Sequence, residues 1–190
     1  MVIYPSDFDI KPGYFKHESH LHGTLHTYRV MCHVMALGSQ LDKPHETLLA
    51  FCAAFVHDMA RHHDGFCLMH GPRAAREKVP EFIPLFTKYE LNAEDISAIK
   101  TAVSNHSQYV ELKIKHPHYL VTALLKDADA LDRVRMGEGN LKQKYLRLPA
   151  TAGLIPFSSQ LYCHSEHKND FSMKAMLDIA EKLLGKNLID

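Results

Sequence analysis

An imidazole and a carboxylate stand side by side at the end of an apolar segment. The residues LLAFCAAFV (48–56) run directly into His57 and Asp58. Burying such groups without partners costs about 1–3 kcal/mol each, so both need hydrogen bonds or a bound cation. Histidine and aspartate are also metal ligands. Taken alone, the pair is typical of a satisfied core histidine beside a helix-end aspartate, and a shared metal ion is the alternative hypothesis.

Histidines also recur at helical spacing near the N-terminus. His22, His26, Arg29 and His33 are four, three and four residues apart, which places them on one face of a helix. A solvated polar face would explain this spacing equally well. The chain has 15 histidines in 190 residues, however, and this excess is a reason to look for a metal site.

Three carboxylates lie close together in the segment LLKDADALDRV. They repel one another unless a cation or an arginine offsets them. Asp129 is flanked by two alanines and is expected to point inward. Asp127 and Asp132 are expected to face solvent, where they would pair with Lys126 and Arg133.

Two further histidines stand at predicted helix ends. His70 opens the segment HGPRAA, and His106 closes the segment AIKTAVSNH. A protonated histidine at a helix C-terminus interacts favourably with the helix dipole. Each of these histidines, taken alone, is typical of a structural residue.

Apolar spacing and cap residues predict six main helices. Gly38 is expected to cap the first, Asn92 with Asp95 to start the fourth, and Gly185 to end the last. A loop is expected through Pro149, Gly153 and Pro156. The segments 80–89 and 140–148 are predicted to add only short helical turns. The expected helices cover 20–37, 42–60, 72–79, 92–106, 117–136 and 172–184.

Alternating strand patterns are nearly absent, so the fold class is predicted as all-α, a single irregular helical bundle. Residues 1–19 are expected to form an irregular N-terminal leader. One helical domain is expected over 20–190, with a motif-bearing core at 20–135 and a C-terminal helical extension at 136–190.

Composition limits the partners. The formal net charge is zero, which argues against nucleic-acid binding. No apolar run approaches the ~20 residues of a membrane span, and no signal peptide is recognised at the N-terminus. Four cysteines without C-x-x-C spacing indicate reduced thiols and a cytoplasmic setting. Nothing in the sequence predicts the oligomeric state.

The order of these motifs resembles that of the HD superfamily of metal-dependent phosphohydrolases. The resemblance covers about residues 20–135 and depends on five separated blocks that agree in type, order and helical context. These blocks are HGTLHTYRV (22–30), FVHDMARHHDG (55–65), HGPRAA (70–75), SNHS (104–107) and KDADALDR (126–133).

The resemblance implies an HD-domain-like helical core that holds one or two divalent metal ions. By motif, the ligands are His26, rather than His22, together with His57, Asp58 and Asp129. His70 and His106 occupy the positions where a second metal or the substrate would bind. The region after Asp132 matches no pattern of the family, so the resemblance predicts no residues of the substrate pocket.

Such a mixed nitrogen and oxygen ligand set suits Mn, Fe, Co, Ni or Zn with open coordination positions. The ion would activate water for attack on phosphorus. Asp58 is the candidate to orient or deprotonate this water, and His106 or His70 could donate protons to the phosphoryl oxygens. Arg29 is the preferred phosphate-binding cation, ahead of Arg61, Lys126 and Arg133. An equally good role for Arg29 is an ion pair with Asp58 or Asp129 that ties helices together.

The predicted function is a metal-dependent phosphohydrolase, of phosphomonoesterase or phosphodiesterase type, that acts on a small phosphate ester such as a nucleotide. Two alternatives stay open. One is a di-iron oxygenase or lyase on the same scaffold, which requires His70 and His106 both to bind metal. The other is a regulatory module that binds a nucleotide without turnover.

Overall fold

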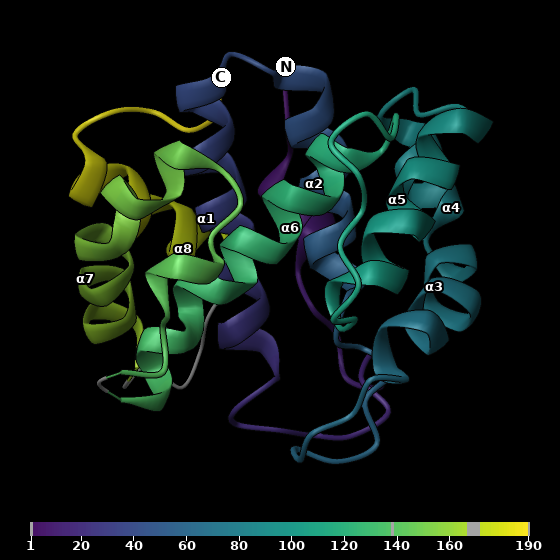
Figure 1. Ribbon diagram of the computed structural model, residues 1–190, viewed down its shortest axis with the longest axis horizontal. Helices are drawn as coiled ribbons and strands as arrows, with labels where there is room; N and C mark the ends of the chain where they lie inside the picture. The colour runs from purple at the N-terminus through teal and green to yellow at the C-terminus, as the bar shows by residue number, and fades with distance from the viewer. Residues whose placement is uncertain (1, 138, 167–171, 190) are drawn as a thin grey trace.

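The computed structural model describes residues 2–137, 139–166 and 172–189, and every regular element in these ranges is a helix (Figure 1). The all-α prediction is therefore confirmed. Short 3₁₀ helices are η1 (Pro5–Phe8), η2 (Asp132–Met136), η3 (Gln143–Tyr145) and η4 (Pro149–Leu154). The α-helices are α1 (Thr24–Leu41), α2 (Pro44–Val56), α3 (His70–Glu81), α4 (Ile83–Lys88), α5 (Ala93–His106), α6 (Tyr119–Leu131), α7 (Ile155–Ser165) and α8 (Met173–Leu184).

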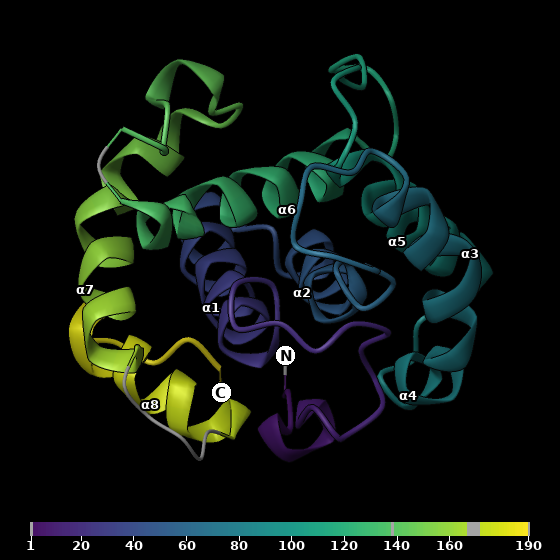
Figure 2. The ribbon, with the colours of Figure 1, turned by 90° about the horizontal axis from the view of Figure 1, so that it is seen from below.

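Helices α1 and α2 lie at the centre of the bundle, and the other helices surround them (Figure 2). Helix α1 packs against α2 and α6, and α3 packs against α5. All residues of α2 from Thr47 to Val56 are buried, as expected for a helix that is apolar on every side. Among the described residues, no helix combines the length and apolar character that crossing a bilayer requires.

The N-terminal leader is part of the core. It contains the 3₁₀ turn η1, and Phe8 at the end of this turn is completely buried. The Phe8 ring meets the rings of Phe51 and Phe55 edge to face, with centroids 4.9 and 5.3 Å apart. This geometry is the preferred one for aromatic pairs, so the leader covers the end of α2.

Two predicted caps are present. Asn92 accepts hydrogen bonds from the backbone of Glu94 and Asp95, and the Asp95 side chain accepts one from the Asn92 backbone N–H. This reciprocal capping box satisfies donors that a helix start leaves free. Gly185 ends α8 in the left-handed conformation, with φ of 64°, which glycine adopts without steric cost.

The prediction that Gly38 caps the first helix is wrong. Helix α1 continues to Leu41 and ends at Asp42, which takes the left-handed conformation with φ of 51°. Gly38 lies inside the helix at its crossing with α2, where an added Cβ would stand 2.0 Å from Oγ1 of Thr47. The glycine therefore permits close packing of two helices.

Gly38→Ala is expected to destabilise the fold by about 1–3 kcal/mol because the methyl group overpacks this crossing. Thr47 cannot easily turn away, since its hydroxyl donates to the Lys43 carbonyl. Urea unfolding measures the loss, with Gly153→Ala as the control, because a Cβ there meets nothing within 4 Å. Equal stability of the two variants would contradict this packing.

The predicted loop through Pro149, Gly153 and Pro156 is also wrong. This stretch forms η4 and then enters α7. Pro149 and Pro156 both stand in the first turn of their helix, where the missing N–H costs nothing and the fixed φ suits a helix. The two prolines therefore start helices rather than interrupt them.

Candidate metal centre

Three helices bring four of the predicted ligands to one point. His26 lies in α1, His57 and Asp58 directly follow α2, and Asp129 lies in α6. The Nε2 atom of His26 is 3.2 Å from Nε2 of His57, 3.4 Å from Oδ1 of Asp129 and 3.6 Å from Oδ2 of Asp58. Two ligands bound to one ion at about 2.1 Å, 90–110° apart, are themselves about 3.0–3.4 Å apart. The three distances from Nε2 of His26 are close to this.

A second group faces the other oxygen of Asp58. His70 is the first residue of α3, and His106 is the last residue of α5. Their Nε2 atoms are 2.8 Å apart and stand 3.1 and 3.5 Å from Oδ1 of Asp58. Nε of Arg61 also stands 2.9 Å from this buried oxygen. Asp58 thus presents one carboxylate oxygen to each pair of histidines.

The hydrogen bonds of the rings determine which nitrogen is free. Nδ1 of His57, His70 and His106 lies 2.6–2.7 Å from the carbonyl oxygens of Ala54, Cys67 and Val103. A carbonyl only accepts, so each Nδ1 carries the proton and each Nε2 of a neutral ring presents a lone pair. The facing Nε2 atoms therefore repel one another unless a proton or a metal ion lies between them.

His26 is oriented by a carboxylate instead of a carbonyl. Its Nδ1 donates to Oδ2 of Asp132 at 2.7 Å. Asp132 is completely buried and also accepts from Arg29 and Arg135. Burial raises the pKa of Asp132, but the His26 hydrogen bond and the charges of Arg29 and Arg135 hold it well below its usual range. A carboxylate in this position fixes the tautomer of a metal-binding histidine.

The expectation that Asp132 and Asp127 face solvent is wrong. Asp127 is also completely buried, and it accepts from the backbone N–H groups of Arg147 and Leu148 at 2.9–3.0 Å. Its Oδ2 accepts from the Thr151 hydroxyl at 2.6 Å. Both carboxylates have partners from segments distant in sequence, and local spacing does not reveal such partners.

Arg29 is not at the surface of the metal cluster, where a phosphate-binding residue is expected. Its guanidinium is buried and pairs with Asp132, with Nε 2.6 Å from Oδ1. Nη1 donates to Ser165 on α7. Arg29 therefore ties helices together, as its alternative role proposed, but through Asp132 and not through Asp58 or Asp129.

His22 adds a further nitrogen to the cluster. Its Nδ1 is 2.9 Å from Oδ2 of Asp58, the oxygen that also faces His26. His22 precedes α1 by two residues, so its ring reaches Asp58 from a bend and not from the helix. Among the described residues, three groups of side chains have ligand atoms within 4.8 Å of one another and could hold a metal ion: His22, His26 and Asp58; His26, His57 and Asp129; His57, Asp58 and His106.

The protonation states suit metal binding. Burial lowers the pKa of His26 to about 4, and burial also lowers the pKa of His70. Burial raises the pKa of Asp58, but the histidines around it, His57 first, bring it well below its usual range. At pH 7, His26 and His70 are therefore neutral and Asp58 is ionised, and these are the forms that bind metal.

A buried histidine outside the cluster gives a pH test of the fold. His33 is completely buried on α1, and burial lowers its pKa from 6.5 to about 4. The unfolded chain therefore binds a proton on this ring between about pH 6.5 and pH 4 that the folded chain does not bind. The stability that the neutral His33 ring contributes to the fold is fully present above this window and is lost as the pH falls through it.

Between pH 7 and pH 5, His33→Leu is expected to lose about 2 kcal/mol less stability than the wild type. Urea unfolding of the metal-free proteins at both pH values measures the difference. The same loss in both proteins would show that His33 does not stay neutral in the folded chain.

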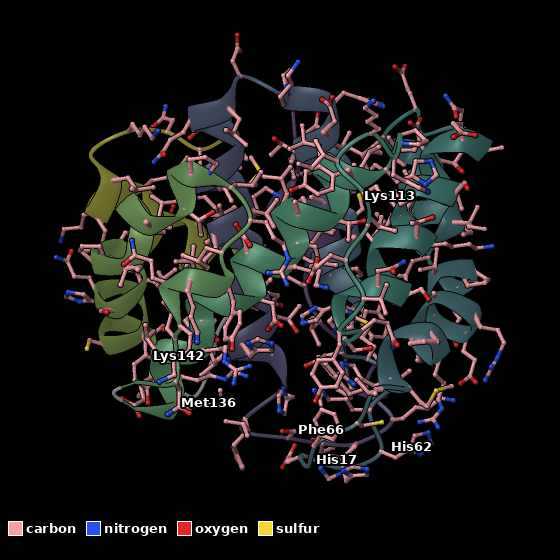
Figure 3. The ribbon with its side chains drawn as sticks, viewed as in Figure 1. His17, His62, Phe66, Lys113, Met136 and Lys142 are labelled. Atoms are coloured by element: carbon pink, nitrogen blue, oxygen red, sulfur yellow. The ribbon has the colours of Figure 1, made fainter. Side chains whose placement is uncertain are left out.

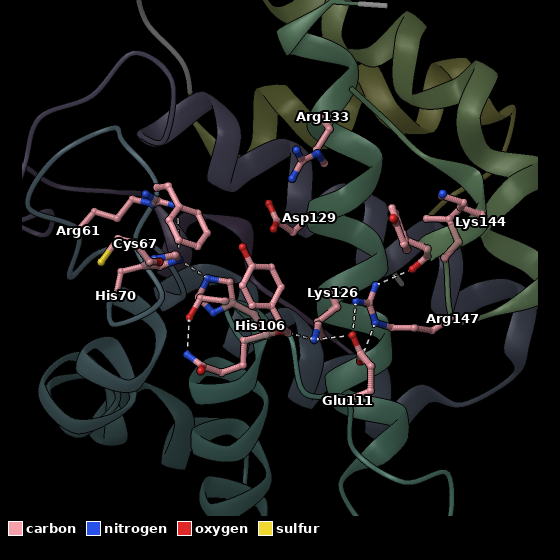
Figure 4. A pocket seen from close by; sticks show the side chains of 16 residues that line it. Arg61, Cys67, His70, His106, Glu111, Lys126, Asp129, Arg133, Lys144 and Arg147 are labelled. Carbon is pink, nitrogen blue, oxygen red and sulfur yellow. Dashed lines mark hydrogen bonds and ion pairs between the residues drawn. The ribbon is translucent and has the colours of Figure 1, made fainter. Parts of the chain in front are cut away.

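A cavity of about 760 Å³ opens beside the cluster. His70, His106 and Asp129 form its inner wall, so both halves of the cluster are reached from it (Figure 4). Cations line it as well, and Arg61, Lys126 and Arg133 are among them. Exposed aromatic rings stand at its edge, where Phe66 and Tyr109 stack with centroids 6.0 Å apart. Phe66 and Tyr109 were not predicted as site residues from the sequence. Their exposure distinguishes them from aromatic residues of the core, and the sequence does not reveal exposure.

Comparison with protein-family models, with curated proteins and with solved structures found no match to this chain. Membership of the HD superfamily therefore stays a prediction from the five sequence blocks.

Proposed function

We propose that this protein is a metal-dependent phosphohydrolase that acts on a small phosphate ester such as a nucleotide. The single observation that carries the proposal is the pair of close contacts between histidine Nε2 atoms, 3.2 Å from His26 to His57 and 2.8 Å from His70 to His106, on either side of Asp58. A divalent cation at each contact would remove the repulsion between facing lone pairs and would be bound by one Asp58 oxygen on each side. We place the activity in a reducing cytoplasm, since Cys32 and Cys52 are buried free thiols.

The ligand set is made of imidazole and carboxylate, which favours Mn, Fe, Co, Ni or Zn. His26, His57, Asp58 and Asp129 would hold the first ion; Asp58, His70 and His106 would hold the second. When bound, the ions supply a lowered pKa of coordinated water and neutralise charge on the phosphoryl oxygens.

The side chains around the ions have separate roles in this proposal. Asp58 would be a ligand at both sites, since each of its oxygens faces a different pair of histidines, and it is placed to orient the attacking water. Arg61 is 2.9 Å from Oδ1 of Asp58 and also lines the cavity, so it is placed to bind a phosphoryl oxygen of the substrate. Asp132 positions His26 without touching the substrate, because it is completely buried.

Hydrolysis by the metal-loaded protein tests the proposal. The protein is loaded in turn with Mn, Fe, Co, Ni and Zn and assayed against a broad panel of nucleotides and a generic aryl phosphate. We expect release of phosphate or of the alcohol with at least one metal, and loss of this activity on chelation. If protein that holds its metal hydrolyses none of these esters, the proposal is wrong. Tight nucleotide binding without product would favour the regulatory module instead.

His70→Ala is expected to lower the bound metal from two ions per chain to one, because the second site would keep only Asp58 and His106. Elemental analysis of the purified variant and the wild type measures the change. His63→Ala is the control, since His63 is exposed and outside the cluster. Two ions in His70→Ala, or one ion in the wild type, would contradict the two-ion arrangement.

The closeness of both His70 and His106 to Asp58 also favours a second candidate function, a di-iron oxygenase or lyase. That alternative requires both histidines to bind metal. It predicts oxygen consumption by the iron-loaded protein in the presence of substrate. The hydrolase predicts turnover that is the same with and without oxygen.

A further inference from the structure

A basic recess extends from the cavity past Asp129. It has a volume of about 270 Å³, and the segment that follows α6 forms most of its wall. We define the basic recess by its four cations, Lys126, Arg133, Lys142 and Arg147. In Figure 4, Asp129 lies between two groups of side chains. Arg61 and His70 stand on one side, and the cations Lys144 and Arg147 stand on the other.

Two of the four cations are already neutralised. Lys126 pairs with Glu111 at 2.8 Å. Arg147 pairs with Glu111 at 2.7 Å and with the buried Asp127 at 3.2 Å. Arg133 and Lys142, by contrast, make no ion pair with any described residue. Two uncompensated cations that line one small recess repel each other, and a bound anion would offset this repulsion.

The uncompensated cations stand on a wall that the fold holds in place. Arg133 Nε donates to the Asn140 carbonyl at 3.1 Å, which orients the guanidinium and leaves its Nη groups available. The Asn140 side chain donates in turn to the Met136 carbonyl at 2.8 Å. The opposite part of the wall is anchored to Asp127 through the backbone of Arg147. A guanidinium oriented in this way binds an anion without losing much conformational entropy.

The recess and the candidate metal centre share two residues. Asp129 and His106 line the recess, and both also line the larger cavity. Oδ1 of Asp129 is 3.4 Å from Nε2 of His26 in the metal cluster. An anionic group in the recess can therefore belong to the same small molecule whose phosphate lies at the metal ions.

We propose that the basic recess binds a second phosphate group of the substrate, one that is not hydrolysed. The substrate class is then small esters that carry two separate phosphate groups. A guanidinium with free Nη groups beside an ammonium is well suited to phosphate, since charge-assisted hydrogen bonds to it are strong. This inference rests on the proposed function, but the recess can be tested without turnover.

Calorimetric titration of the metal-free protein with inorganic phosphate tests the recess directly. Arg133→Gln/Lys142→Gln is expected to raise the Kd for phosphate at least about tenfold, through the loss of hydrogen bonds to a charged ligand. The matched control is Lys113→Gln/Lys115→Gln, which removes two exposed lysines outside the recess and is expected to leave the Kd unchanged. Figure 3 shows Lys113 and Lys142 in well-separated parts of the molecule. Equal Kd values for the wild type and the recess variant would overturn the inference.

Kinetics of the metal-loaded protein provide the second test. The wild type is expected to have a KM at least about tenfold lower for a nucleoside 3′,5′-bisphosphate than for the matching 5′-monophosphate, and the recess variant should abolish this ratio. A ratio that persists in the variant would overturn the inference. If the metal-loaded protein hydrolyses neither these two esters nor any other ester of the panel, the proposed function fails, and the phosphate titration still decides whether the recess binds phosphate.

Discussion

Asp58→Asn is expected to bind neither metal ion and to hydrolyse phosphate esters at least about a thousandfold more slowly than the wild type. The reason is that each oxygen of Asp58 faces a different pair of histidines, so one substitution affects both sites. An amide has the same shape as the carboxylate, but it is neutral and cannot bridge two cations. Elemental analysis gives the metal content, and the assay with the best ester from the panel gives the rate.

The control for this variant is Asp64→Asn. Asp64 is an exposed aspartate on the loop after α2, where it accepts from Ser19 and is not part of the cluster. It should keep both ions and the full rate. Circular dichroism of the metal-free proteins checks that Asp58→Asn keeps its helices. A folded Asp58→Asn that retains its ions would contradict the bridging role.

Asp132→Ala is expected to destabilise the metal-free protein by about 3–5 kcal/mol, the usual cost of removing one partner of a buried ion pair. Asp132 is completely buried and compensates Arg29 and Arg135. Without it, two guanidinium groups stay close together with no carboxylate between them. Urea unfolding of the metal-free variant measures the loss of stability.

The matched control is Asp178→Ala, which removes an exposed aspartate that pairs with Lys174 four residues away. Exposed pairs of this kind contribute at most about 1 kcal/mol. A second readout separates the positioning of His26 from stability alone: metal affinity at a temperature where the Asp132→Ala variant is folded should fall about 10–100-fold. Unchanged affinity would show that Asp132 supports the fold but does not position the ligand.

The helices were largely predictable because their signals are local. The capping box of Asn92 with Asp95 and the glycine stop at Gly185 depend only on neighbouring residues, and both are present. Gly38 was misread because its role depends on Thr47 of another helix. Helix α7 was missed because a proline early in a helix and a proline in a loop have the same local sequence, and only the buried face of the segment distinguishes them.

At the candidate metal centre, the sequence identified the candidate ligands but not the groups that hydrogen-bond to them and orient them. His26, His57, Asp58 and Asp129 were chosen through the family resemblance, and the structure places their atoms within a few ångströms of one another. The roles assigned to these residues stay predictions. The carbonyl groups that set the histidine tautomers could not be identified from the sequence, because any residue type offers a carbonyl.

Asp132 shows a different limit of sequence reasoning. Its neighbour Arg133 suggested a local ion pair at the surface. Asp132 is instead buried, and besides Arg135 it pairs with His26 and Arg29, which are more than 100 residues away in the chain. The spacing of His26 and Arg29 on one helix face was visible in the sequence, and a single buried carboxylate that serves both would have explained it. The Arg29 side chain was correctly expected to point toward the His26 side of α1, but toward Asp132 and not toward a phosphate.

Anomalous diffraction at the absorption edge of the bound metal is the most direct test of the central claim. Crystals of the metal-loaded protein should show one peak between His26, His57 and Asp129 and a second between His70 and His106, with Asp58 between the two. Peaks only at exposed loop histidines, or no peak near Asp58 in protein that retains its metal, would contradict the account.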